Sequence, residues 1–213
     1  MYFAHVLQPL PRLRRGGPSG SLPEGERELI ETERLVIRLA KAEDVPEIIR
    51  FYRDNREHLQ PFSPTYRPDF LESLTWLDQV RHRAHELEAG AGFRGFLFLR
   101  SQPDRIIGNI NLTQVYRGAF QSCVLGYNLA ADEQGHGYMT EAVRAAVAFA
   151  FDLWGLHRVA ANYMPRNARS AAVLERCGFK VEGNAPAYLR INGVWEDHVL
   201  TSIINPSWKD SAS

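Results

Sequence analysis

Residues 121–155 carry the clearest pattern of hydrophobic and polar positions in the chain. A short apolar run from Cys123 to Leu129, bounded by polar residues, predicts a buried strand. A polar turn follows at 130–137 and contains Gly135 and Gly137. After it, apolar residues recur every three or four positions, which predicts a helix that ends at Gly155. The apolar face of this helix comprises Met139, Val143, Ala146, Val147, Ala150, Leu153 and Trp154. A strand, a glycine turn and a helix in this order direct free backbone N–H groups toward an anion.

Alternating positions and turn residues predict the remaining elements. Further strands are expected at about 34–39, 93–100, 106–115 and 157–163, with a turn at 101–104, and a closing hairpin at 183–189 and 195–203 turns at Asn192-Gly193. Helices are expected from Asp44 to Asp54, from about 168 to 177, and from Pro68 onward, where Leu71 and Leu74 begin an apolar face. The total is about seven strands and four helices, antiparallel at first and parallel beside the main helix, which describes a mixed α/β sheet.

Composition indicates one globular domain preceded by an arm. Residues 1–30 are rich in proline, glycine and arginine, which predicts a flexible N-terminal arm, and residues 31–208 remain as the folded domain. Hydrophobic residues make up 45% and charged residues 23% of the 213 positions, as in ordinary globular proteins.

Charge and cysteine content argue against several classes of protein. Lys+Arg and Asp+Glu both number 25, so the formal net charge is +0 and nucleic-acid binding is not expected. No apolar run approaches the roughly 18–20 residues that cross a bilayer, and no secretory signal opens the chain, so a cytoplasmic protein without membrane contact is expected. Cys123 and Cys177 lack CxxC spacing, which is typical of reduced thiols. His82 and His85 share a helix face without a third ligand, so no metal site is predicted.

Three readings compete for the glycine turn. A dinucleotide fingerprint would need a third glycine where Thr140 stands, and a GxxxxGK[ST] phosphate loop would need a lysine. The stretch Gln134-x-x-Gly137-x-Met139 instead resembles the Q/R-x-x-G-x-G/A loop of the GCN5-related N-acetyltransferase (GNAT) superfamily, which binds the pyrophosphate of acetyl-coenzyme A. Met139 departs from the final Gly or Ala of that pattern, as in members of the ribosomal-protein acetyltransferase branch that carry larger residues there.

A second stretch resembles the same superfamily. Residues 167–179, NARSAAVLERCGF, are similar to its N-x-x-S/A…E-x-x-G-F signature, in which a short helix ends at a glycine before a strand. Residues 188–200 resemble the closing hairpin of RimJ/RimL-type ribosomal-protein alanine N-acetyltransferases, residues 34–39 their first strand, and residues 117–120 a loop of the RimJ side. The resemblance covers about residues 31–208 and implies the GNAT fold. It also implies an enzyme that transfers acetyl from acetyl-CoA directly to a protein N-terminal α-amine, expected to be an N-terminal alanine of a ribosomal protein.

The resemblance assigns residues to the cofactor. Backbone groups of a strand end are expected to pair with the pantetheine arm, and the turn and helix start to hold the pyrophosphate. Asn167 either reaches the cofactor or caps the helix that follows it. The expected cofactor-binding residues are Tyr127, Asn128, Leu129, Gln134, Gly135, His136, Gly137, Tyr138, Met139, Thr140, Asn167 and Ser170.

The positions of the superfamily's usual general acid and general base carry other residue types in this sequence. Leu174 stands where many superfamily members have an acidic tyrosine, so Ser170 is the candidate acid by resemblance to RimL-like enzymes, with a helix cap as its alternative role. Ala187 replaces the glutamate of RimL-like hairpins, which leaves Asp197 as the candidate base and Glu57 and His58 as alternatives. An α-amine of pKa about 7.8 is roughly 14% neutral at pH 7, whereas a lysine is roughly 0.04% neutral. A site without a strong base therefore fits an α-amine acceptor better than a lysine.

Two rival functions stay open. The same fold could acetylate a small amine, which an acidic cleft would favour, or the chain could bind acyl-CoA without catalysis, since Leu174 and Ala187 replace common catalytic types. Several aromatic residues fall in loops or hairpin positions around the expected cleft, where they either frame a peptide N-terminus or, as is more common, serve in ordinary packing: Phe62, Tyr66, Tyr116, Phe120, Tyr188 and Trp195. Packing is the preferred role for Trp195.

Overall fold

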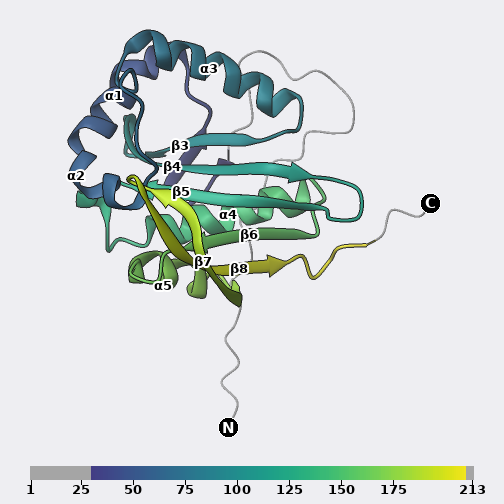
Figure 1. The fold of residues 1–213 in the computed structure, drawn as a ribbon. Coiled ribbons are helices and arrows are strands. Elements are labelled where there is room, and N and C mark those ends of the chain that lie inside the picture. The colour runs from purple at the N-terminus through teal and green to yellow at the C-terminus, as the bar shows by residue number, and fades with distance from the viewer. Residues whose placement is uncertain (1–29, 210–213) are drawn as a thin grey trace.

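The computed structural model describes residues 30–209, which are organised around one eight-stranded sheet (Figure 1). The predicted N-terminal arm lies outside the described residues except for Ile30. Strand order is β1-β2-β3-β4-β5-β6-β8-β7, and every neighbouring pair is antiparallel except β5 and β6, which are parallel. The strands are β1 (Ile30–Glu31), β2 (Leu35–Arg38), β3 (Phe93–Leu99), β4 (Gln102–Tyr116), β5 (Ser122–Leu129), β6 (Arg158–Tyr163), β7 (Lys180–Ile191) and β8 (Val194–Ile204).

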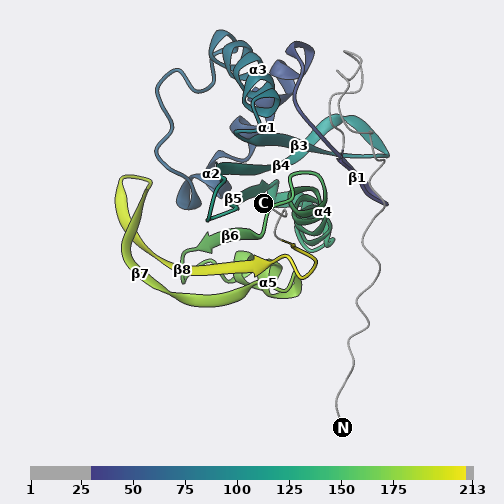
Figure 2. The same ribbon diagram turned by 90° about the vertical axis from the view of Figure 1, so that its right-hand side faces the viewer.

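Helices cover both faces of the sheet (Figure 2). They are α1 (Val45–Asp54), α2 (Arg56–Leu59), α3 (Ser73–Glu88), α4 (Tyr138–Asp152) and α5 (Ala168–Arg176), with short 3-10 helices η1 (Ala42–Asp44), η2 (Gln60–Phe62) and η3 (Ala131–Glu133). One core packs α4 and α5 against the sheet, and a second packs α1, α2 and α3 against the opposite face. Five buried alanines of α4 keep this helix close to the strands beneath it: Ala142, Ala145, Ala146, Ala148 and Ala150.

The predicted fold class is confirmed, and the differences have local causes. The two elements missing from the predicted seven strands and four helices are β1, of two residues, and α2, of one turn, which are too short to show a period. Helix α3 begins at Ser73 rather than at Pro68, because turns close between Arg67 and Phe70 and between Asp69 and Glu72. The expected apolar residue Leu74 is consequently 75% exposed.

The closing hairpin turns at Asn192-Gly193, as predicted. Both residues have positive φ, 44° and 86°, the requirement of a two-residue type I′ turn. The tip reaches the segment after α2, where the Asn192 N–H donates to the Ser63 carbonyl at 3.0 Å and the Gln60 amide donates to Asn192 Oδ1 at 3.1 Å. The hairpin therefore closes over the end of the sheet at which β5 and β6 terminate.

Candidate active site

A gap in the sheet forms the site. The parallel strands β5 and β6 pair only from Ser122 to Val124 on β5, although β5 continues for five more residues to Leu129. Beyond Val124 this edge of β5 has no strand partner among residues 30–209, because β6 continues along β8 alone. The cleft that results has a volume of about 3110 Å³. A pocket for one small ligand measures roughly 300–1,000 Å³, so this cleft can hold two substrates at once.

The glycine turn and the start of α4 form one end of the cleft. Gly135 and Gly137 have φ of 84° and 79°, a left-handed conformation that L-residues rarely adopt, and Gly137 is the N-cap of α4. Within the described chain, no backbone N–H from 135 to 140 donates to another protein group. These N–H groups and the positive end of the α4 dipole suit an anion.

Arg34 holds this turn in place, a role that its position in a strand pattern did not indicate. Its guanidinium donates to the His136 carbonyl at 2.9 Å and pairs with Glu141, in the first turn of α4, at 2.6 Å. Glu141 also accepts from Thr32 at 2.5 Å. Burial alone would raise the pKa of Glu141, but the hydrogen bonds from Thr32 and Arg34 hold it below its ordinary value. The turn is thereby attached to the first strands of the sheet.

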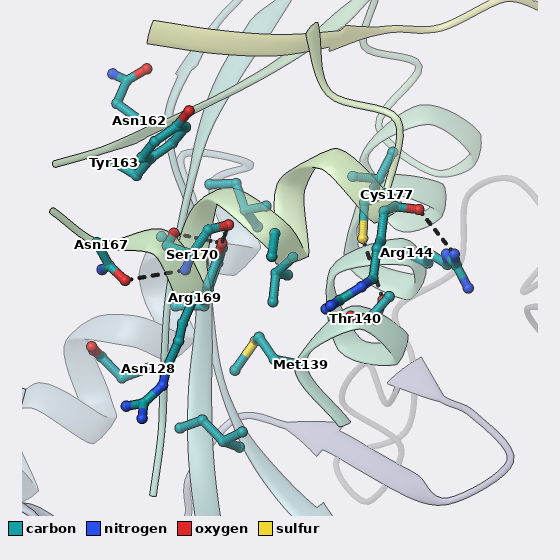
Figure 3. A pocket seen from close by; sticks show the side chains of 18 of the residues that line it. Asn128, Met139, Thr140, Arg144, Asn162, Tyr163, Asn167, Arg169, Ser170 and Cys177 are labelled. Carbon is teal, nitrogen blue, oxygen red and sulfur yellow. Dashed lines mark hydrogen bonds between the residues drawn. The ribbon is translucent and has the colours of Figure 1, made fainter. Parts of the chain in front are cut away.

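Ser170, which Figure 3 shows beside Asn167, meets Tyr127 across the gap. Asn167 caps α5 by accepting from the Ser170 N–H at 3.1 Å, so Asn167, and not Ser170, is the helix cap. The Ser170 hydroxyl lies 2.8 Å from the Tyr127 hydroxyl, which is also 3.2 Å from the Ser170 carbonyl. Burial raises the pKa of Tyr127 well above its ordinary value, so the phenol stays protonated and can donate. Leu174 is buried in the core and only 1% exposed.

Residues further along α5 line the same cleft as the turn. Cys177 donates to the Thr140 carbonyl at 3.6 Å, and burial raises the pKa of its thiol to about 11, so it is not a thiolate near neutral pH. Arg144 on α4 donates to the Arg176 carbonyl at 2.9 Å, which joins the two helices (Figure 3). Met139, 5% exposed, packs in the core at the helix start and also lines the cleft (Figure 3).

The opposite end of the cleft, here termed the hairpin end, is lined by polar groups and aromatic rings, and by Arg166, whose guanidinium lies over the Phe62 ring. Its lining includes Phe62, Ser63, Asn111, Asn128, Asn162, Tyr188, Leu189 and His198. Asn111 and Asn128 both donate to Asn109 Oδ1, at 3.2 and 3.4 Å, and Asn162 donates to the Tyr188 hydroxyl at 3.2 Å. None of the described residues that line this end is Asp or Glu.

The predicted base Asp197 is not brought to the cleft. It is exposed, lies outside the cleft lining, and accepts from the Ala187 N–H at 2.7 Å. This bond supports a bulge in β7 between Ala185 and Leu189, in which Ala187 has φ of 46°. The bulge presents Tyr188 to the cleft, while His198, adjacent to Asp197 on β8, is buried and lines it. Successive residues of a strand point to opposite faces, so the two neighbours cannot share a role.

Of the other residues that the sequence suggested for the acceptor side, some line the cleft and some do not. His58 lines the cleft, but its Nε2 lies 2.8 Å from the Gln134 amide nitrogen and is thereby occupied, and Glu57 is outside the lining. Phe62 and Tyr188 line the cleft as expected, whereas Tyr66 stacks on Phe70 in the α1–α3 core. Tyr116 and Phe120 pair with each other next to the β4–β5 turn, outside the lining.

Trp195 contradicts its predicted packing role. Its side chain is 62% exposed, because Trp195 lies near the hairpin tip on the face that carries Asp197.

No helix within residues 30–209 is long and apolar enough to cross a bilayer. In the same range no group of three or more His, Cys, Asp or Glu side chains is arranged to hold a metal ion, and His82 and His85 are exposed on α3.

Comparisons with known proteins agree on one relationship. The acetyltransferase (GNAT) domain family matches residues 34–180. The chain is 38% identical over 181 residues to the ribosomal protein uS5-alanine N-acetyltransferase of Escherichia coli K12, covering 84% of this chain and 92% of that protein. The ribosomal-protein-S5-alanine acetyltransferase of Vibrio fischeri superposes with a TM-score of 0.81 at 35% identity, covering 85% and 99% of the two chains. RimJ of Mycobacterium smegmatis, in complex with CoA-disulfide, has a TM-score of 0.75 at 27% identity and coverage of 80% and 81%.

Proposed function

Because this chain belongs to the GNAT family of acetyltransferases, we propose that it transfers acetyl from acetyl-CoA to a protein N-terminal α-amine, the N-terminal alanine of a ribosomal protein. The observation that carries the proposal is the gap between β5 and β6, which is open to a donor at the glycine turn and to an acceptor at the hairpin end. Direct transfer requires both substrates to lie in one site, and this cleft is large enough for that.

The residues at the glycine turn fit acetyl-CoA. The N–H groups of residues 135–140 and the α4 dipole would hold the pyrophosphate, and the unpaired edge of Tyr127, Asn128 and Leu129 would accept the pantetheine amides as an added strand would. Gln134 and Asn167 would border this arm, since both line the cleft. When bound, acetyl-CoA supplies the acetyl thioester, and its sulfur is the leaving group.

The hairpin end fits a peptide N-terminus better than a polyamine or an aminoglycoside. Polycationic small molecules are recognised by carboxylates, and the described lining of this end contains none. Its asparagine amides and the Tyr188 hydroxyl instead offer hydrogen bonds to peptide groups. The ion pair between Arg166 and Glu196, 2.8 Å long, leaves no uncompensated charge on the neighbouring loop.

Ser170 is the proposed acid for the leaving sulfur. A serine hydroxyl alone is a weak acid, but the Tyr127 phenol lies 2.8 Å from its oxygen and can turn its one hydrogen to that oxygen from the Ser170 carbonyl, 3.2 Å away. As Ser170 gives up its proton, the hydrogen bond from Tyr127 becomes a bond to a developing negative charge and strengthens. Tyr127 is therefore a positioning residue that acts through Ser170.

The proposal is tested by thiol release from acetyl-CoA with a panel of acceptors. A peptide that begins with a free alanine should turn over, and the same peptide with its α-amine blocked should not. A lysine peptide with a blocked N-terminus should react roughly 300-fold more slowly at pH 7 from its neutral amine fraction alone. Mass spectrometry should locate the acetyl group on the first residue.

Two outcomes would refute the proposal in different ways. Preferred turnover of spermidine or an aminoglycoside would move the enzyme to small-amine acetylation. Tight coenzyme A binding by calorimetry, without turnover of any peptide or of the purified ribosomal protein S5, would identify a binding protein instead.

A further inference from the structure

His198 is a buried histidine that faces the hairpin end of the cleft. Its side chain is 5% exposed, and it lines the same cavity as Ser170 and Asn162. Its ring lies 5.4 Å from the Tyr188 ring, centroid to centroid, and the Tyr188 hydroxyl accepts from Asn162 on β6. The imidazole thus packs against a Tyr188 ring that is itself held by β6 at the hairpin end of the cleft.

The protonation of the ring follows from one contact. His198 Nδ1 lies 3.0 Å from the Glu196 carbonyl oxygen, which can only accept, so Nδ1 carries the hydrogen. In the neutral imidazole the other nitrogen, Nε2, then has a free lone pair. Within the described chain, no protein group donates to Nε2. A histidine held in one tautomer by a backbone carbonyl is a common arrangement for a general base.

We propose that His198 is the general base of this site, an inference that rests on the proposed function. Nε2 takes one proton from the α-ammonium of the acceptor, directly or through one water, and leaves a neutral amine. The amine nitrogen forms its bond to the thioester carbonyl carbon, the carbon–sulfur bond breaks, and the sulfur takes the Ser170 proton. The second proton of the attacking nitrogen passes to solvent, from which Ser170 is reprotonated, and His198 releases its proton to water.

Other titratable groups near this end are already engaged. The Tyr188 hydroxyl accepts from Asn162, Glu196 pairs with Arg166, and His58 is bonded through Nε2 to Gln134. Tyr163 on β6 also lines the cleft, but a phenol is protonated near neutral pH. His198 is therefore the group at this end whose free lone pair faces the cleft and suits proton removal.

The test compares His198→Asn with wild type from pH 6 to pH 9, with an alanine-initiated peptide as acceptor. Asparagine can still donate a hydrogen bond to the Glu196 carbonyl but has no basic nitrogen. The variant therefore keeps this hydrogen bond and removes only the base. His82→Asn, the same change on the exposed face of α3, is the matched control. Coenzyme A affinity by calorimetry and the melting temperature report on folding and on the donor site independently of turnover.

The expected result is a loss of about 100-fold in kcat/KM for His198→Asn at pH 7, at the low end of what general bases contribute. This loss should shrink to roughly 15-fold at pH 9, because the neutral fraction of the α-amine rises about sevenfold between these pH values. Coenzyme A affinity should stay within about twofold of wild type, and added imidazole should restore activity to His198→Ala, as chemical rescue of a missing base requires.

Three results would overturn the inference while wild-type turnover still supports the proposed function. The first is activity of His198→Asn within about threefold of wild type at pH 7, below the contribution of a general base. The second is a loss of equal size at every pH. The third is a larger and pH-dependent loss for Asp197→Asn, which would return the base to Asp197.

Discussion

Replacing Tyr127 with Phe removes one hydroxyl and tests whether the phenol acts through Ser170. The hydroxyl is 2.8 Å from Ser170 Oγ, and burial raises its pKa, so it stays protonated across the assay range and can donate to that oxygen. A neutral hydrogen bond contributes about 0.5–1.5 kcal/mol, and one to a charged group about 1.5–3 kcal/mol. If the bond changes from the first kind to the second as the sulfur leaves, the transition state loses about 1–1.5 kcal/mol more than the ground state, and kcat should fall by roughly 5- to 13-fold.

The loss should appear in kcat rather than in binding. The phenol contacts only Ser170 in the described chain among polar groups, so KM for the peptide and coenzyme A affinity should stay within about twofold. The melting temperature should fall only by the few degrees that one neutral hydrogen bond accounts for. Initial rates at saturating acetyl-CoA, with calorimetric coenzyme A binding in parallel, separate these quantities.

A double-mutant cycle gives the decisive comparison. If Tyr127 works through Ser170, the variant that combines Tyr127→Phe with Ser170→Ala should be no slower than Ser170→Ala alone. Independent, multiplicative losses would refute the relay, as would a Tyr127→Phe enzyme with wild-type kcat.

Three further predictions follow from the geometry. Gly137→Val should weaken coenzyme A binding at least tenfold by calorimetry, because a β-branched residue at φ of 79° costs about 1–2 kcal/mol or shifts the N–H groups that face the anion; unchanged affinity would remove the turn from the donor site. Glu141→Gln should lower the melting temperature at pH 7, and this difference should vanish once the pH is below the lowered pKa of Glu141. The lowered pKa of Glu141 gives stability that is full above its ordinary value of 4.5 and is lost as the pH falls through the lowered pKa, so melting curves that stay apart at acidic pH would contradict this. Leu174→Tyr should reduce stability by about 1–3 kcal/mol in urea unfolding and should not raise kcat, since the site is in the core; a faster enzyme would show that the hydroxyl reaches the cleft.

Local chemistry explains which features the sequence could predict. The positive φ values of Gly135, Gly137 and Gly193 are properties of short segments, so the anion-binding turn and the hairpin turn could be located from residue types alone. The cap role of Asn167 was one of two readings, and the hydrogen bond to the Ser170 N–H assigns it.

Contacts between distant segments explain what the sequence could not predict. Tyr127 and Ser170 are 43 positions apart, and Arg34 and Glu141 are 107 apart, so no local pattern reports either pair. The segment after Pro68 carries leucines at helical spacing but is closed by turns as far as Ser73. The burial of Trp195 was predicted wrongly, because its exposure depends on how far the hairpin extends beyond β6.

The register of β8 decides which of two adjacent residues, Asp197 or His198, faces the cleft. A shift of one residue along a strand turns every side chain to the opposite face. The bulge in β7 adds residues opposite Asp197, and the bond from Ala187 to Asp197 fixes where that extra length lies. Asp197 thus supports the bulge that places Tyr188 beside His198 at the hairpin end of the cleft. Variation of the bulge would change the groups presented to the acceptor without changing β5, α4 or the donor half of the cleft.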